Sequence, residues 1–309
     1  AVAMPGRISG LCMDCLRGDV MTKKITTKQE IPPYAELHVS SNFSFLRGAS
    51  HAEELVLTAA TKGLYAIAIT DCNTLAGIVR GHTAHRNYAD RLKYVVGCRL
   101  DPMDGPSILC YPTDRLAYGR LCQLLTLGKR RAPKGSCEIY VADIIAHSDG
   151  LLFVAVPPQL PDEDFRNELM DLQSHLDGKI WLAVGRFMDG FDRERLAFSE
   201  AIEADLGIPV VVTNDVHMHL RSRKPLQDVL TCIRHRCPIE DAGYRLFPNG
   251  ERHIKSPGEM ARLFPDHPHW LSRTVEIADQ CSFTLAELKY EYPDENDGSG
   301  EDTQERLVR

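Results

Sequence analysis

Short apolar runs alternate with helical stretches from residue 34 onward. The runs predict seven strands, at residues 35–39, 65–70, 93–97, 107–111, 151–156, 180–184 and 209–213. Their near-continuous hydrophobicity is typical of strands buried on both faces, and alternation with helices favours a parallel sheet or barrel. Only about nine residues separate the third run from the fourth, too few for a helical crossover. The pattern therefore predicts an α/β fold, a seven-stranded (β/α) barrel that is distorted or contains a hairpin.

Helix starts and a change of pattern divide the chain further. Ser50 with Glu53, and Ser256 with Glu259, form S-x-x-E capping boxes ahead of apolar positions. After residue 219 only helices are expected, followed by a polar, acidic stretch. We expect a flexible extension at 1–33, the α/β domain at 34–245, a helical segment at 246–295 and an acidic linker at 296–309.

Charge and composition exclude several classes of protein. The net charge is −7, and residues 291–309 contain seven acidic and two basic side chains, so the middle of the chain is only mildly acidic. It shows no basic stripe of the kind that a free-standing nucleic-acid binder carries. No apolar run is long enough for a membrane span and no secretory signal is visible, which predicts a cytoplasmic protein without a membrane partner. The ten cysteines are typical of reduced thiols, with Cys12 and Cys15 only a weak zinc candidate.

Polar residues cluster where the expected strands end, the edge at which parallel α/β barrels carry their functional groups. They are His38 with Ser40, Asp71 with Cys72, Cys98 with Arg99, and Asp215 with His217. Because strand side chains repeat every two residues, Asp215 and His217 face the same centre. Imidazole and carboxylate groups are ligands for zinc or manganese, so this edge is a candidate metal site.

Several motifs, in this order, resemble one family. LHVSSNFSFLRGAS, AIAITDCNTLAGIVR, LCQLLTL, VVVTNDVH, LQDVLTCIR, ERHIKSPGEMARLF and RTVEIADQCSFTLAELKYEYPDE are similar to the N-terminal part of bacterial error-prone DNA polymerases of the C family. These relatives of the replicative alpha subunit begin with a polymerase-and-histidinol-phosphatase (PHP) domain. The resemblance covers roughly residues 34–295 and implies a PHP domain at 34–245, followed by a helical entry to the polymerase core.

The resemblance also implies a metal site that this chain has partly lost. In metal-binding PHP domains the first motif is H-x-H, which here reads His38-Val39-Ser40, and a ligand a few residues later corresponds to Arg47. The second motif, T-D-H, reads Thr70-Asp71-Cys72. In the third motif, G-x-E, the glutamate position is occupied by Arg99. Only the last motif, Asn214-Asp215-Val216-His217, is intact. The implied vestigial ligands are therefore His38, Asp71, Cys72, Asp215 and His217, and the replaced ligand positions are Ser40, Arg47 and Arg99.

Arginine at two ligand positions argues against metal binding. A guanidinium cannot be deprotonated, and at about 4 Å and an effective dielectric of about 20 it repels a divalent ion by roughly 8 kcal/mol. We expect Arg47 and Arg99 to replace the metals as fixed cations that pair with Asp71 and Asp215. Simpler interpretations remain open: His38 and His217 as buried core histidines, Asp71 as an N-cap or Asx-turn residue, and Cys72 as a small buried side chain.

The resemblance implies DNA synthesis past lesions by the parent protein, with magnesium bound in a palm domain that should begin after residue 295. We expect the region itself to be an inactive platform without a cofactor, which meets DNA and polymerase accessory proteins only through the full-length enzyme. We also expect that translation begins at Met21 and that the chain is a fragment. Two alternatives stay open: a phosphoesterase or 3′–5′ exonuclease using zinc or manganese, and an interaction module, which would need an exposed apolar patch.

Overall fold

The computed structural model describes residues 31–176 and 178–288, in which eight strands form two sheets. The first sheet is parallel throughout and contains β1 (Ala35–Val39), β2 (Ala66–Ile69) and β3 (Lys93–Val96). The second has the order β4 (Cys98–Leu100), β5 (Ile108–Pro112), β6 (Leu151–Ala155), β7 (Ile180–Val184) and β8 (Val210–Val212). In it β5 runs antiparallel to both neighbours, whereas β6, β7 and β8 are parallel.

The α/β class is confirmed, but the single seven-stranded barrel is not. Two isolated bridges connect the sheets, Val39 with Val216 and Cys72 with Arg99, and no continuous ladder closes them. The strand that sequence analysis missed is β4, whose three residues pair with β5. That pairing makes β4 and β5 a hairpin, which is one of the two alternatives that the short link before residue 107 left open.

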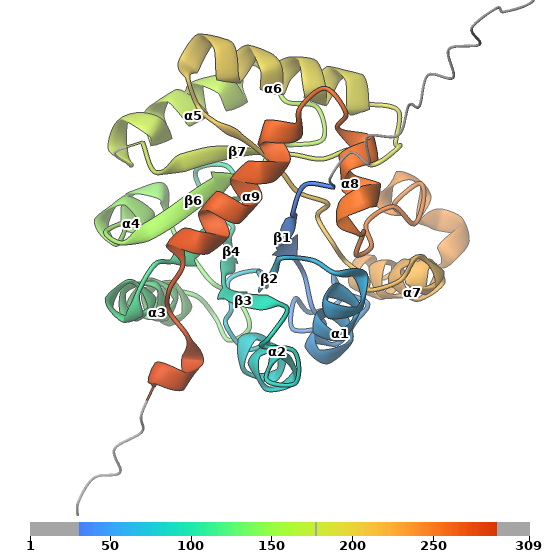
Figure 1. Cartoon of the computed structure of the whole chain (residues 1–309), viewed down its shortest axis with the longest axis horizontal. Helices are drawn as coiled ribbons and strands as arrows, with labels where there is room; N and C mark the ends of the chain where they lie inside the picture. The colour runs from blue at the N-terminus through green and yellow to red at the C-terminus, as the bar shows by residue number, and fades with distance from the viewer. Residues whose placement is uncertain (1–30, 177, 289–309) are drawn as a thin grey trace, which may run out of the picture. The chain divides into compact units, whose positions relative to one another are not determined.

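The helices lie around the strands (Figure 1). They are α1 (Ala52–Lys62), α2 (Ile78–His85), α3 (Arg115–Arg131), α4 (Val141–Ala146), α5 (Glu163–His175), α6 (Asp192–Leu206), α7 (Lys224–His235), α8 (Pro257–Leu263) and α9 (Pro268–Gln280). The capping box at Ser256 is confirmed. The one at Ser50 is wrong by one position, because α1 is capped at His51, whose N–H donates to Glu54, while Ser50 Oγ lies 2.7 Å from His219 Nδ1.

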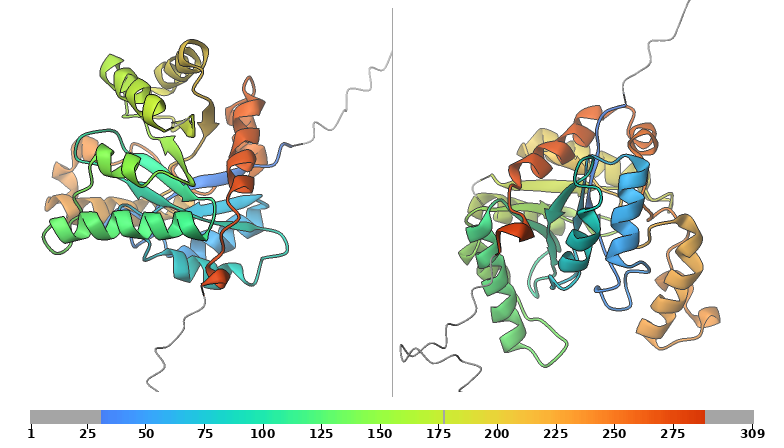
Figure 2. Two further views of the ribbon diagram at one scale, coloured as in Figure 1. Left: turned by 90° about the vertical axis from the view of Figure 1, so that its left-hand side faces the viewer. Right: turned by 60° about the horizontal axis from the view of Figure 1, so that its bottom comes forward.

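Helix α9 closes the amino-terminal end of the parallel strands. Thr274 Oγ1 accepts the N–H of Ala35 at the start of β1, and Arg273 donates to the carbonyl of Val210 at the start of β8. Ile277 and Ala278 pack with the side chains that point inward from the strands, such as Leu37. Figures 1 and 2 show α9 lying across the strands. The strand ends that carry the candidate residues are therefore at the opposite, open end.

Parts of the expected domain layout fall outside the described residues. The linker at 296–309, most of the extension at 1–33, and Cys12 with Cys15 lie there. The eight described cysteines are free thiols. No helix in the described part of the chain is both long and apolar enough to cross a lipid bilayer. A boundary at residue 245 stays a prediction, although α9 packs directly on β1 and β8.

Candidate functional site

Three of the predicted site residues meet at the open end of the strands. The backbone after β8 is fastened beside the end of β1, because Ser40 N–H donates to Val216 and Val216 N–H donates to His38, each at 2.8 Å. Oδ1 of Asp215 consequently lies 3.2 Å from Nε2 of His38 and 3.2 Å from Nε2 of His217. These three side chains form the centre of the candidate site, as the strand periodicity indicates.

Asp71 has a different role from the one predicted. Its carboxylate accepts hydrogen bonds from the backbone N–H and the hydroxyl of both Ser41 and Ser44, at 2.6–3.1 Å. Burial raises the pKa of Asp71, and these four hydrogen bonds oppose the rise. The prediction that an arginine pairs with Asp71 is wrong: the carboxylate anchors the loop that follows β1.

Arg99 also has another partner. Its Nε donates to Asp101 at 2.7 Å and its Nη2 to Ser107 at 2.9 Å. The thiol of Cys72 donates to the same Asp101 at 3.1 Å, and burial raises the pKa of that thiol to about 12. Cys72 is therefore a protonated thiol at neutral pH.

Arg47 and Ser40 are the other two positions at which sequence analysis expects a lost ligand. Among the described residues, neither side chain forms a hydrogen bond or an ion pair with Asp215. The Arg47 side chain is exposed, and only its carbonyl contacts the site, 3.2 Å from Nδ1 of His217. Ser40 is buried and connects β1 to the segment after β8 through its backbone.

The cation that pairs with Asp215 is Arg252, which sequence analysis missed. Its Nη1 binds Oδ2 of Asp215, and its guanidinium lies 3.8 Å from the ring centre of Phe187 and 4.5 Å from that of Phe247. The carbonyl of Arg252 accepts the N–H of His217 at 3.0 Å, which fixes this segment beside the last motif. The only signal in the sequence was its place in the ERHIKSPGEMARLF motif.

The electrostatics of the site follow from burial and from this ion pair. Burial alone would raise the pKa of Asp215, but His38, Arg252 and His217 together hold it well below its usual value. Burial lowers the pKa of His38 to about 4, and Arg99, His217 and Arg252 offset the attraction of Asp215. At neutral pH we therefore take Asp215 as ionised and His38 as neutral. Nε2 of His38 lies close to Oδ1 of Asp215, but neither ring nitrogen of His38 makes a hydrogen bond of good geometry among the described residues.

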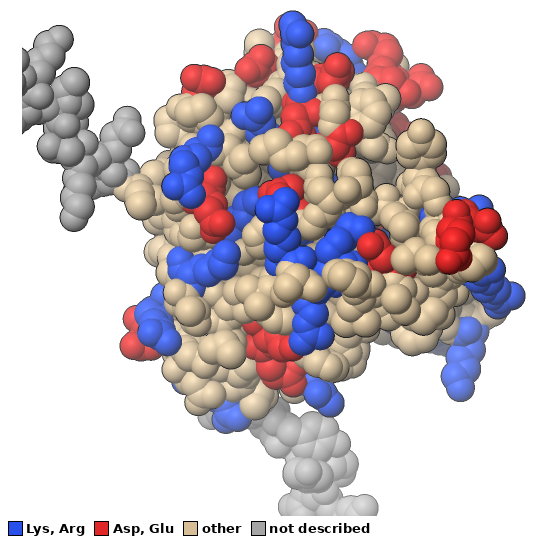
Figure 3. Space-filling view, turned by 90° about the vertical axis from the view of Figure 1, so that its right-hand side faces the viewer, with Lys and Arg blue, Asp and Glu red and all other residues tan. Residues whose placement is uncertain are grey.

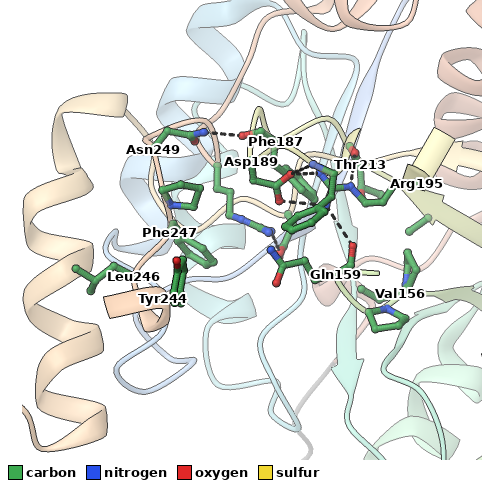
Figure 4. Close-up of a pocket in the computed structure, with 18 of the residues that line it drawn as sticks. Val156, Gln159, Phe187, Asp189, Arg195, Thr213, Tyr244, Leu246, Phe247 and Asn249 are labelled. Carbon is green, nitrogen blue, oxygen red and sulfur yellow. Dashed lines mark hydrogen bonds and ion pairs between the residues drawn. The ribbon is translucent and has the colours of Figure 1, made fainter. Parts of the chain in front are cut away.

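A cavity of about 650 Å³ opens beside these residues. Aromatic side chains line one part of it, among them Phe187, Tyr244 and Phe247 (Figure 4). On another wall Arg195 is bound to Asp189 at 2.6 Å and Asp192 at 2.5 Å. Arg195 and Arg252 along the cavity are thus already paired, whereas Arg245 on its lining forms no ion pair among the described residues. The space is largely apolar, with a few polar groups.

The residues present do not fit a divalent metal ion. His38, Asp215 and His217 converge, but in residues 31–176 and 178–288 no group of three or more His, Cys, Asp or Glu side chains has an arrangement that could hold a metal ion. Asp215, the central carboxylate, is already neutralised by the Arg252 guanidinium, and Arg99 adds a second positive charge close enough to lower the pKa of His38. A guanidinium cannot lose its charge to make room for a cation.

Comparison with known proteins agrees with this fold. A family model described as "PHP domain" matches residues 36–204. The chain belongs to the PHP domain family. An error-prone DNA polymerase of Caulobacter vibrioides is 50% identical over 278 residues, covering 90% of this chain and 26% of that protein. Error-prone DNA polymerase 1 of Agrobacterium fabrum is 44% identical over 278 residues, covering 90% of this chain and 25% of that protein.

These relatives confirm the resemblance to the PHP region of bacterial error-prone DNA polymerases. The chain spans about a quarter of the length of the curated relatives it matches. Among solved structures, an amidohydrolase of Chromobacterium violaceum matches this PHP domain with a TM-score of 0.47 and 13% identity, over 60% of this chain and 88% of that one.

Proposed function

We propose that this PHP domain belongs to an error-prone, DNA-directed DNA polymerase and serves in it as a catalytically inactive structural platform. The observation that carries the proposal is the ion pair of Arg252 with Asp215. A permanent organic cation neutralises the central carboxylate, so the fold has no need of a metal there. In this proposal His38, Asp71, Cys72, Asp215 and His217 are vestiges of a ligand set, and Ser40, Arg47 and Arg99 stand at lost ligand positions.

The outer face of α7 supports a role as a platform. Leu226, Val229 and Ile233 repeat at helical spacing, and they are 39%, 49% and 55% exposed, whereas the polar Gln227 and Thr231 on the inner face are buried. Ile239 is 52% exposed and extends this apolar face through a shallow groove. The face of the molecule in Figure 3, on the α7 and α8 side, shows broad uncharged surface beside Lys and Arg.

An apolar helix face turned to solvent is typical of a contact surface. These exposed apolar side chains on α7 support the contact surface that an interaction module requires, for which sequence analysis found no clear evidence. This chain covers about a quarter of the length of the curated relatives. We therefore propose that the polymerase body, in the remaining part of the same polypeptide, covers the apolar face of α7. Residues 246–295 would then lead into the polymerase core.

The activity of the parent polymerase is part of the same proposal. It would copy damaged DNA in the cytoplasm, with magnesium held by palm carboxylates beyond this region, and would reach DNA and accessory proteins through the full-length enzyme.

The second candidate is a phosphoesterase or 3′–5′ exonuclease that uses zinc or manganese at the PHP site. It is favoured by the convergence of His38, Asp215 and His217 beside a cavity. Its difficulty is that any metal must compete with Arg252 for Asp215.

One experiment separates the two candidates. The purified chain is dialysed with and without Mn²⁺ or Zn²⁺, its metal content is determined by elemental analysis, and hydrolysis of a phosphodiester and of 3′-labelled single-stranded DNA is followed. The platform predicts no tightly held metal at a stoichiometric level and no hydrolysis above that of an Asp215→Asn variant. Stoichiometric metal together with hydrolysis that Asp215→Asn abolishes would establish the second candidate.

A further inference from the structure

Three arginines from separate parts of the chain converge on one surface, together with His235. Arg47 belongs to the loop after β1, Arg234 to the last turn of α7, and Arg245 to the 3₁₀ turn Gly243–Arg245. Nη1 of Arg234 lies 3.4 Å from the carbonyl of Leu46, which ties α7 to that loop. We call Arg47, Arg234, His235 and Arg245 the arginine cluster.

No acidic side chain of the described residues forms an ion pair with this cluster, although neighbouring arginines are paired. Arg223 binds Glu54 at 2.5 Å, and Arg221 binds Glu251 at 2.8 Å. Within the cluster the charges repel one another. The pKa of Arg234 is lowered by burial and by the positive charge of Arg47. The pKa of His235 is lowered mainly by burial, and further by the positive charges of the three arginines. In a chain of net charge −7, the fold therefore concentrates positive charge here against repulsion.

The helix dipole accounts for only part of the arginine cluster. Cations are favoured at a helix C-terminus, which explains Arg234 and His235 at the end of α7. Arg47 and Arg245 lie outside α7, so this explanation does not apply to them. Their exposed side chains also make no contribution to a core. A ligand that carries several negative charges would relieve the repulsion.

Two exposed aromatic side chains accompany the arginines. Tyr244, next to Arg245, is fully exposed, and Phe45, two residues before Arg47, is 81% exposed. Figure 4 shows Tyr244 at the edge of the cavity. Cations that neutralise phosphates, beside aromatic rings on which bases stack, are the combination with which proteins hold single-stranded nucleic acid. An acidic peptide would match the charge but would give no reason for the open aromatic rings.

We propose that the arginine cluster, with Tyr244 and Phe45, binds single-stranded DNA. The surface is formed by side chains outside the Asp215 ion pair, and it goes beyond the proposed function, because a structural platform need not touch DNA. Arg47 then has a role of its own at the surface. Each arginine neutralises a phosphate, and the rings offer stacking to unpaired bases without reading their sequence.

The test measures fluorescence anisotropy of a labelled oligothymidylate of about 16 nucleotides mixed with the full 309-residue chain. We expect binding that weakens as salt rises from about 50 to about 200 mM. Exchanging Arg47→Gln and Arg245→Gln together should weaken binding about tenfold and flatten the salt dependence. Tyr244→Ala alone should weaken binding at least about fivefold, with little change in salt dependence.

The matched control removes two exposed arginines from α3, Arg115→Gln with Arg130→Gln, and so changes the net charge equally. It should bind the oligonucleotide as the parent chain does. Circular dichroism of each variant confirms that the fold is kept. Absence of binding, or equal losses in the α3 control, would overturn the proposal. Displacement of the oligonucleotide by a poly-glutamate of equal charge at equal concentration would also overturn it, in favour of an acidic protein partner. None of these outcomes affects the platform proposal, which depends on metal content and hydrolysis.

Discussion

Arg252 and Asp215 form an ion pair across 37 residues of sequence, and each side chain is only 16% exposed. The pair lies at the open end of the strands, where a PHP domain with a complete ligand set would gather carboxylate and imidazole groups. Phe187 and Phe247 cover the guanidinium, which strengthens its attraction to Asp215 by excluding water. This relationship generates the first prediction.

Replacing Arg252 with methionine should lower the free energy of unfolding by about 3–5 kcal/mol, because it leaves the buried Asp215 carboxylate without its permanently charged partner. Adding Asp215→Asn should recover part of that loss. Urea denaturation of the two single variants and the double variant measures the coupling. The matched control is Arg221→Met, which breaks the ion pair with Glu251. Because the Arg221 side chain is 67% exposed, this change should lower the free energy of unfolding by less than about 1 kcal/mol. Equal losses for Arg252→Met and Arg221→Met would contradict the importance of the buried pair.

Acid should destabilise the protein through His38. Its pKa falls from 6.5 when unfolded to about 4 when buried, so between these values the unfolded chain binds more protons than the folded one. Stability therefore decreases as pH falls from about 6.5 to about 4, by up to about 3 kcal/mol from this side chain. The variant His38→Gln removes that contribution, so its stability relative to the parent should improve on acidification through this window.

The measurement is the difference in free energy of unfolding between His38→Gln and the parent chain at several pH values. Glu36, whose pKa burial raises to about 7, acts in the opposite direction, since its stabilising contribution is lost as pH rises toward 7. It is present in both proteins, so its effect cancels in the difference to a first approximation. A difference that stays constant with pH would show that His38 is not held neutral by the fold.

Gly77 should not tolerate even a methyl group. A Cβ built there would lie 2.3 Å from Oδ2 of Asp71 and 2.9 Å from Oγ of Ser41, so it would disturb the hydrogen bonds that anchor the loop. We expect Gly77→Ala to lower the stability by about 2 kcal/mol or more. Gly119→Ala, within α3 and with open space around the added carbon, should raise it by about 0.5–1 kcal/mol. The measurement is thermal denaturation of both variants. A Gly77→Ala protein as stable as the parent chain would contradict the close approach of residue 77 to Asp71 and Ser41.

The outer face of α7 should be dispensable for folding. Ile233→Lys places a charge on an exposed position, so the stability of the isolated chain should change by less than about 0.5 kcal/mol. Binding of a hydrophobic dye to the chain should fall, and DNA synthesis by the polymerase that carries this region should decrease. The same exchange at Ile277, on the buried face of α9, should unfold the protein. Full polymerase activity with Ile233→Lys would exclude this face as a contact in the platform.

Sequence alone determined the features that depend on neighbouring residues. Continuous apolar runs predicted seven of the eight described strands, and Ser256 with Glu259 predicted the start of α8. The short link excluded a helical crossover between the third and fourth runs, but it did not reveal β4. The resemblance also led us to expect lost ligands at Ser40, Arg47 and Arg99, from their places within the quoted motifs. These signals are local, because the pattern of apolar residues and helix capping depend on residues close together in the sequence.

Only the tertiary structure decided which charges meet. The sequence supplied the arginines but not their partners, so the predicted pairing of Arg99 with Asp215 gave way to Arg252, and Arg47 belongs to a surface cluster. Sequence analysis did not identify the exposed apolar face of α7, because a pattern along the chain cannot tell which face of a helix the rest of the fold covers. Here the buried face is the polar one that carries Gln227. Ion pairs and exposed faces depend on how distant segments pack, because Coulomb attraction and burial act through space and take no account of separation along the chain.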